Sequence, residues 1–240
     1  MNFATHPDVI GGTKFSADWP GFVRRFTERE LPGVHCALFN GAQGDTNHLN
    51  PYDLQTCRAD RYAFSARMGR VITDAVCALW ENTAPCTSER LTAAVSEVAV
   101  KTRTDGEERY EEMKAFYAAY EAGTLGRKTN SAELGEARRI MDIRTAPIYN
   151  YVTLTVLGIG DALFVGFGGE PFTAYADRLR REVDCPLLLT GCNTNGSVGY
   201  LPTSAAYEEG GYESRGTAFV PELEEIVLQG VLKMIKERES

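Results

Sequence analysis

The chain has 240 residues, and its 33 Asp and Glu residues outnumber its 25 Lys and Arg residues, which gives a formal charge of −8. Hydrophobic residues at 43% and charged residues at 24% are typical of a globular protein and exclude a disordered, collagen-like or coiled-coil chain. The acidic balance predicts no nucleic-acid partner, because nucleic-acid binders usually carry a basic face. A chain of this length buries a core without help from disulfides or metal.

The cysteines are scattered along the chain, and no two of them form a CxxC pair. We therefore expect free thiols and a reducing compartment. The first residues, MNFATHPDVIGG, lack the basic and apolar regions of a signal peptide. The longest mostly apolar stretch, residues 146–160, is too short and too polar to cross a bilayer. The sequence predicts a cytoplasmic protein without a transmembrane segment.

The first part of the chain predicts a helix, a strand and a loop. The helix begins at Asp18, has Pro20 in its first turn and ends before Pro32-Gly33. The apolar run 34–39 has the length of a strand. Residues 41–51 are rich in Gly, Asn, Asp and Pro, which favour a loop.

A long helix over 58–81 and a strand over 95–100 follow. The helical repeat of apolar residues predicts a buried face made by Phe64, Met68, Val71, Ile72, Ala75, Val76, Leu79 and Trp80. Residues 105–142 are charged and helix-forming, and we interpret them as a helical insertion. Its aromatic residues either cover a groove for an acyl chain or pack on the core of a solvated excursion; they are Phe116, Tyr117 and Tyr120.

The second part of the chain predicts strands that alternate with helices. Residues 191–218 are rich in Gly and Tyr and are expected to form a loop. The expected strands are 149–157 and 162–167, joined as a hairpin, and 186–190; the expected helices are 170–182 and 222–236. Residues 1–240 are thus expected to form one α/β domain, with a mixed β-sheet and flanking helices.

Polar side chains occur where the expected strands meet loops. Sites in α/β proteins gather at the carboxyl ends of strands, so these side chains could converge. Each also has a purely structural explanation, as a terminal residue, a turn former, a helix first-turn acid or a packing aromatic. The residues are His6, Asp45, Glu170, Tyr200, Tyr207 and Tyr212. No Walker A loop, HExxH motif or nucleotide-binding glycine pattern accompanies them.

Several segments resemble the neutral/alkaline, non-lysosomal ceramidase family, in the same order. They are NFATHPDVIGG followed by SADWPGFVRR, FNGAQGDTN (39–47), GEPFTAYADRL (169–179) and GYLPTSAAYEEGGYES (199–214). The resemblance implies a ceramidase-like α/β fold, represented here by the C-terminal part of the catalytic domain. It also implies a zinc-dependent amidase that hydrolyses the N-acyl bond of ceramide to sphingosine and a fatty acid.

The resemblance assigns roles to particular residues. His6, Glu170 and Tyr200 match zinc ligands, and Tyr212 matches a tyrosine that stabilises the oxyanion of the reaction. Beside these residues we expect Asp45 to take part in the catalytic site, as an acid that either positions its loop or supports the metal ligands from behind. The chemistry is consistent, because zinc lowers the pKa of a bound water to about 7 and a tyrosine hydroxyl can hydrogen-bond the developing oxyanion.

The sequence departs from the family pattern in three places. A further zinc histidine, in a His-Thr-His segment, precedes the first matching motif in the family, and neither His35 nor His48 lies in such a segment. Residues 40–45 contain no serine where the family has one. Pro171 separates the glutamate from the Phe-Thr that follows it directly in the family.

We therefore expect an amidohydrolase that acts on ceramide or another N-acyl, lipid-like substrate. Its zinc site is incomplete in this chain alone, and a complementing chain or a longer gene would supply the missing ligand. A homo-oligomer is a further expectation. The alternative is a catalytically degenerate or truncated family member that acts as a binding or structural protein.

Overall fold

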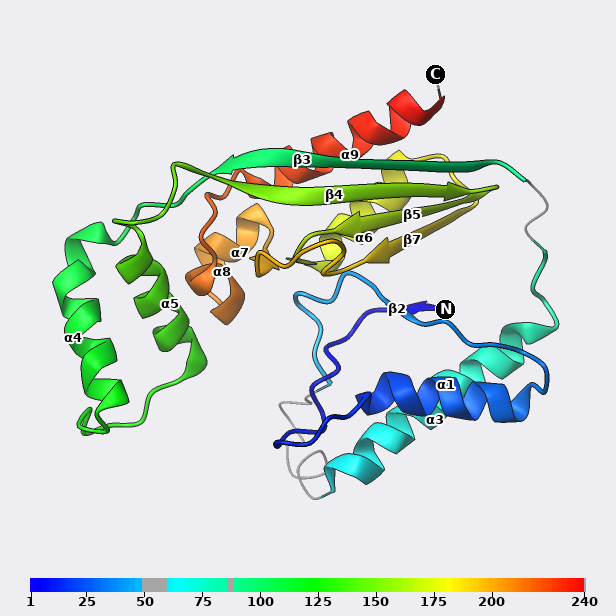
Figure 1. Ribbon diagram of the computed structural model, residues 1–240, viewed down its shortest axis with the longest axis horizontal. Coiled ribbons are helices and arrows are strands. Elements are labelled where there is room, and N and C mark those ends of the chain that lie inside the picture. Colours follow the sequence, from blue (N-terminus) through cyan, green and yellow to red (C-terminus); the bar gives the residue numbers. More distant parts are fainter. Residues whose placement is uncertain (49–59, 86–88, 240) are drawn as a thin grey trace.

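The computed structural model describes residues 1–48, 60–85 and 89–239. Its centre is a sheet with the strand order β3-β4-β5-β7 (Figure 1). The pairs β3–β4 and β4–β5 are antiparallel, whereas β5–β7 is parallel, so the sheet is mixed as predicted. The strands are β3 (Leu91–Lys101), β4 (Tyr149–Ile159), β5 (Ala162–Phe167) and β7 (Leu187–Gly191).

Two helices cover one face of this sheet and form the main core with it. They are α6 (Thr173–Glu182) and α9 (Leu223–Glu239). Alternate strand residues point toward these helices, because side chains of a strand alternate between its two faces. The core includes Val100, Leu154, Val165, Phe167, Tyr175, Leu179, Leu223, Val227 and Val231. The predicted hairpin and terminal helix are therefore confirmed.

The strand predicted over 34–39 is wrong for most of its length. Only β2 (Phe39–Asn40) is a strand, and it pairs in parallel with β1 (Asn2–Phe3). The backbone N–H groups before it bond elsewhere: that of Val34 donates to the Leu31 carbonyl, and that of Cys36 donates to the Glu28 carboxylate. These local partners replace the ladder that a strand would need.

The region 191–218 is not a plain loop. It contains β8 (Tyr200–Leu201) and two short helices, α7 (Ser204–Glu209) and α8 (Tyr212–Gly216). β8 pairs in parallel with β6 (Glu170–Pro171), so the helix expected from residue 170 begins only at Thr173. Pairing between segments distant in sequence therefore overrides the local helix signal at Glu170.

The charged segment 105–142 forms helices, as expected. The elements are η1 (Glu107–Arg109), α4 (Tyr110–Glu121) and α5 (Ser131–Asp142), which lie together at one end of the sheet (Figure 1). Met113, Ala137 and Ile140 form a small core between them, against which Phe116 and Tyr117 pack. No helix in the described part of the chain is long and apolar enough to cross a membrane.

The helices α1 (Asp18–Glu30) and α3 (Arg61–Trp80) pack against each other through small residues. The buried positions of α3 are Ser65, Gly69 and Thr73, which are four residues apart and share one face. The predicted apolar face is only partly correct: Phe64, Met68 and Ile72 pack on a core around Trp19, whereas Val71, Leu79 and Trp80 are exposed.

Replacement of Gly69 tests this helix contact. A Cβ at Gly69 would lie 2.5 Å from the Phe22 Cβ and 3.1 Å from the Val23 nitrogen. We expect Gly69→Val to lower the free energy of unfolding by about 1–3 kcal/mol, because overpacking displaces α1. Urea denaturation measures the change, and Ala78→Val at an exposed position of α3 is the control. Equal stability of the two variants would contradict the close contact.

Candidate metal and substrate site

Four of the five residues singled out by the family resemblance lie in one continuous group. Glu170 and Tyr200 are register partners in the β6–β8 pair. The Nδ1 atom of His6 lies 3.6 Å from the Glu170 Oε2 atom. The Tyr200 ring lies between two others, with centroid distances of 6.0 Å to His6 and 5.6 Å to Tyr212.

The backbone on both sides of His6 is fixed by hydrogen bonds. Asn40 clamps the preceding residue: its Nδ2 donates to the Thr5 carbonyl at 3.0 Å, and its Oδ1 accepts from the Thr5 N–H at 3.3 Å. The His6 N–H donates to the Thr46 carbonyl, and the Trp19 Nε1 donates to the His6 carbonyl. The imidazole therefore projects from a held segment, although residues 4–7 belong to no strand.

The Glu170 carboxylate has a partner that the sequence did not indicate. Gln43 is buried, and its Nε2 donates to the Glu170 Oε2 at 3.4 Å. Asn40 Nδ2 in turn donates to the Gln43 Oε1, which orients the amide toward Glu170. Gly44 follows and packs directly on the backbone of Glu170 and Pro171, where a Cβ would clash with both carbonyl oxygens. The FNGAQGD segment thus supports the carboxylate.

Asp45 binds a helix terminus. Its Oδ1 accepts from the Thr173 N–H at 2.7 Å, and its Oδ2 accepts from the Thr173 hydroxyl at 2.9 Å. A carboxylate at the first turn of α6 satisfies a free N–H group and interacts favourably with the helix dipole. This contact joins the loop that carries Gln43 to the helix that follows Glu170. A role of Asp45 in the reaction stays a prediction.

Of the candidate site residues, all but Glu170 border a cavity of about 560 Å³. No Lys or Arg is among the described residues that line it. Besides His6, Asp45, Tyr200 and Tyr212, the lining includes groups that sequence reasoning missed. These are Asp8, Gly44, Thr46, Asn47, Asn130, Ser131, Ala132 and Glu213. Their only common signal is position in loops or at helix starts, which does not distinguish them from many other polar residues.

Burial makes the polar groups near Glu170 hard to ionise. The pKa of Tyr200 is raised well above its usual value, first by burial and then by the negative charge of Glu170. The same two causes raise the pKa of Cys192 to about 11. Both side chains are therefore protonated at neutral pH, and a metal bound through the Tyr200 phenolate would have to displace a proton.

The residues present match part of a zinc site. No group of three or more His, Cys, Asp or Glu that could hold a metal occurs in the described ranges. Tetrahedral zinc with bonds of about 2.0–2.2 Å holds its donor atoms about 3.4 Å apart. The separation of 3.6 Å between His6 Nδ1 and Glu170 Oε2 is close to that value. Two donors therefore fit zinc, with Tyr200 beside them.

The other histidines do not join this group. His35 is exposed and lies in no strand, although the strand predicted over 34–39 would have contained it. His48 is buried at its side chain, and its Nδ1 lies 2.9 Å from the Asp8 Oδ1. This Asp8–His48 pair stands at the border of the cavity and was not anticipated from the sequence.

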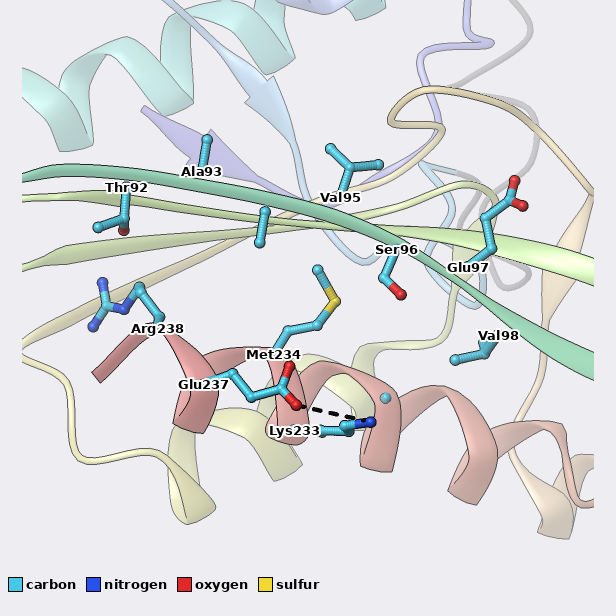
Figure 2. A pocket seen from close by; sticks show the side chains of 12 residues that line it. Thr92, Ala93, Val95, Ser96, Glu97, Val98, Lys233, Met234, Glu237 and Arg238 are labelled. Carbon is cyan, nitrogen blue, oxygen red and sulfur yellow. Dashed lines mark ion pairs between the residues drawn. The ribbon is translucent and has the colours of Figure 1, made fainter. Parts of the chain in front are cut away.

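A second cavity, of about 540 Å³, lies between β3 and α9 (Figure 2). Lys233 and Glu237 form an ion pair across its floor at 3.8 Å. Thr92, Ser96 and Val98 point toward the helix. None of the residues indicated by the family resemblance lines this cavity, so we assign it no part in the chemistry.

Comparison with known proteins supports the fold. No protein-family model and no curated protein matches the chain. Two solved structures match over 99% of it, each with a TM-score of 0.69: a neutral ceramidase from Pseudomonas aeruginosa at 15% identity, and a ceramidase complexed with C2 at 13% identity. The chain spans 44% and 45% of those two chains. Its fold is therefore similar to part of a neutral ceramidase, as the sequence motifs implied.

Loss of the Asp45 contact tests the positioning role. We expect Asp45→Ala to lower the free energy of unfolding by about 1 kcal/mol, because the Thr173 N–H loses its acceptor at the start of α6. Guanidinium denaturation measures this difference. Asp177→Ala is the matched control, since that exposed carboxylate of α6 pairs with Arg180 of the same helix. If the control destabilised the protein as much as Asp45→Ala, the contact would have no special role.

Proposed function

We propose that this chain carries part of the active site of a zinc-dependent amidohydrolase that cleaves an N-acyl amide bond. The observation that supports it is the continuous line His6–Glu170–Tyr200–Tyr212 beside a polar cavity, in a fold similar to part of a neutral ceramidase. His6 Nδ1 and Glu170 Oε2 would hold the zinc, with the Tyr200 hydroxyl as a further ligand.

Each residue has a distinct task in this proposal. Zinc, when bound, polarises a carbonyl and lowers the pKa of a bound water to about 7. Gln43 keeps the Glu170 carboxylate oriented through its amide N–H. Tyr212, which is partly exposed and lines the cavity, donates a hydrogen bond from its hydroxyl group to the amide carbonyl oxygen as negative charge develops there.

The cavity walls suggest a polar substrate group near the scissile bond. Asp8, Asp45 and Glu213 line the cavity without a Lys or Arg among its described lining residues. Phe116 and Tyr117 pack inside the α4–α5 pair, which favours the packing alternative over an acyl-chain cover. We therefore propose N-acyl amines with a short or exposed acyl chain as first substrates to screen, with ceramide as the comparison.

A complementing polypeptide would complete the metal site. The chain spans less than half of the ceramidases it resembles. The sheet face opposite α9 exposes apolar side chains of β3 and β4, including Leu91, Val95, Tyr151 and Ile159, and Figure 2 shows Val95 pointing away from the helix. Exposed apolar areas of this kind mark protein contacts. The missing histidine could arrive on the polypeptide that covers this face, from a second copy or another chain.

A second candidate function is a binding protein without catalysis. The incomplete ligand set favours it, because described residues supply His6, Glu170 and Tyr200 but no second histidine. Metal binding separates the two candidates. A binding protein that has lost catalysis has no need for zinc at Glu170, whereas the amidohydrolase requires it.

Zinc titration is the direct test. We expect the purified protein to bind zinc, and we expect Glu170→Gln and Tyr200→Phe each to weaken binding about 10–100-fold, because each removes or neutralises a ligand. Isothermal titration calorimetry measures the affinity. Glu97→Gln and Tyr149→Phe, on the sheet face away from α9, are matched controls. Wild-type affinity in both site variants would refute the metal proposal.

Removal of one hydroxyl tests the oxyanion role. We expect Tyr212→Phe to lower kcat on the best N-acyl substrate about 10²–10³-fold, because a donor to the developing oxyanion is lost. KM and zinc content should change little. Steady-state kinetics on a fluorogenic N-acyl amide measures the effect, with Tyr149→Phe as the control. A change in KM alone would assign Tyr212 to substrate binding.

A further inference from the structure

The short helix α8, which begins with Tyr212, is held at its other end by two guanidinium groups. Arg103 Nη1 donates to the Ser214 carbonyl at 2.7 Å, and Arg139 Nε donates to the Arg215 carbonyl at 3.1 Å. The last carbonyls of a helix have no partners within it and carry partial negative charge. Two cations at this end therefore fix where a five-residue helix stops.

Arg139 is unusually constrained for a charged residue. Its side chain is 4% exposed, and its Nη1 donates to the Asp105 carbonyl at 3.0 Å and lies 3.6 Å from the Asp105 carboxylate. Burial and the nearby Arg103 lower the pKa of Arg139, although an arginine still remains charged at neutral pH. A buried guanidinium persists only where its donors are satisfied, so its position is closely defined.

A second residue on the same face of α5, Glu136, also contacts α8. Arg215 Nε donates to the Glu136 Oε2 at 3.1 Å, and Arg109 Nη1 donates to the Glu136 Oε1 at 3.1 Å. Glu136 and Arg139 are three residues apart and therefore lie side by side on α5. Glu136 therefore ties α5 both to α8 and to Arg109, the last residue of η1, which immediately precedes α4.

α5 and α8 approach each other closely beside the Tyr212 ring. A Cβ on Gly135 would lie 3.6 Å from the Gly216 Cα and 4.0 Å from the Tyr212 Cε2. The same ring also contacts the Tyr200 ring, at a centroid distance of 5.6 Å. The Tyr212 ring thus lies close to both α5 and the candidate zinc ligand, and a shift of α5 would change its position at the cavity.

We propose that α5 positions the Tyr212 hydroxyl for the reaction, with Arg139 as the positioning residue and Gly135 as the contact surface. The role of Tyr212 in catalysis rests on the proposed function. The contacts that hold α8 and the Tyr212 ring in place do not depend on it. In this proposal the segment 105–142 supports the site. Arg139 does not touch the substrate and acts on Tyr212 through α8.

The test uses the full chain with 3-fluorotyrosine placed at position 212, observed by ¹⁹F NMR. We expect Arg139→Gln to move or broaden the resonance, because α8 loses the donor to its Arg215 carbonyl. Arg138→Gln is the matched control: this neighbouring, exposed arginine donates to the Tyr117 hydroxyl within the helix pair. Gly135→Leu is a second variant, which leaves every ion pair in place and presses on the ring directly.

Kinetics and metal binding complete the experiment. In the unlabelled protein, Arg139→Gln should lower kcat about tenfold or more, since small misplacements of a catalytic group are costly. KM and zinc affinity should stay near wild type, and Arg139→Lys should restore part of kcat. A loss of kcat matched by Arg138→Gln would overturn the positioning role.

The two proposals fail in different ways. If the wild-type protein neither binds zinc nor hydrolyses amides, the proposed function is refuted, while a ¹⁹F shift in Arg139→Gln and Gly135→Leu still supports positioning. If the resonance stays at its wild-type position in both variants, the positioning is refuted whatever the activity.

Discussion

The parallel pairing of Glu170 with Tyr200 brings together segments thirty residues apart, and the rest of the candidate site is arranged around it. The neighbouring strands β5 and β7 are parallel, so both end at the same edge of the sheet. β6 follows β5 and β8 follows β7, which brings the two short strands together at that edge. Gly44 packs on the β6 backbone, and the Gly44 N–H donates to the Pro171 carbonyl at 2.8 Å. Through that contact the FNGAQGD segment brings Gln43 to Glu170 and Thr46 to the backbone of His6.

Polar groups around this pairing are held mainly by hydrogen bonds to uncharged partners. The amides of Asn40 and Gln43 form a chain that ends on the Glu170 carboxylate. Such a chain orients the carboxylate but does not neutralise its charge, whereas an arginine in the same place would neutralise it. This arrangement leaves the carboxylate available for a cation, beside a cavity whose described lining contains no Lys or Arg. Ion pairs occur instead around α5, where Glu136 pairs with Arg215 of α8 and with Arg109 of η1.

Much of the fold follows from local patterns. The hairpin of β4 and β5, the helices α1, α3 and α9, and the helical character of 105–142 were predicted because their apolar repeats and end signals are strong. The elements that failed are short: β2, β6, β8, α7 and α8. Two-residue strands have no periodicity to detect, and their pairing partners lie far away in the sequence. The face of α3 was mispredicted because small residues, which an apolar repeat does not count, make its closest contact.

The sequence by itself determined the composition class, the long elements and, through ordered motifs, the resemblance to neutral ceramidases that the fold comparison supports. It also named His6, Asp45, Glu170, Tyr200 and Tyr212. Only the tertiary structure decided which of them meet, because contacts between distant segments depend on sheet register and loop paths. It placed Asp45 on a helix terminus, Gln43 on Glu170, and α5 behind Tyr212. Composition alone did not indicate the apolar side chains that β3 and β4 expose on the sheet face opposite α9, because which face of a strand is covered depends on the helices that pack against the sheet.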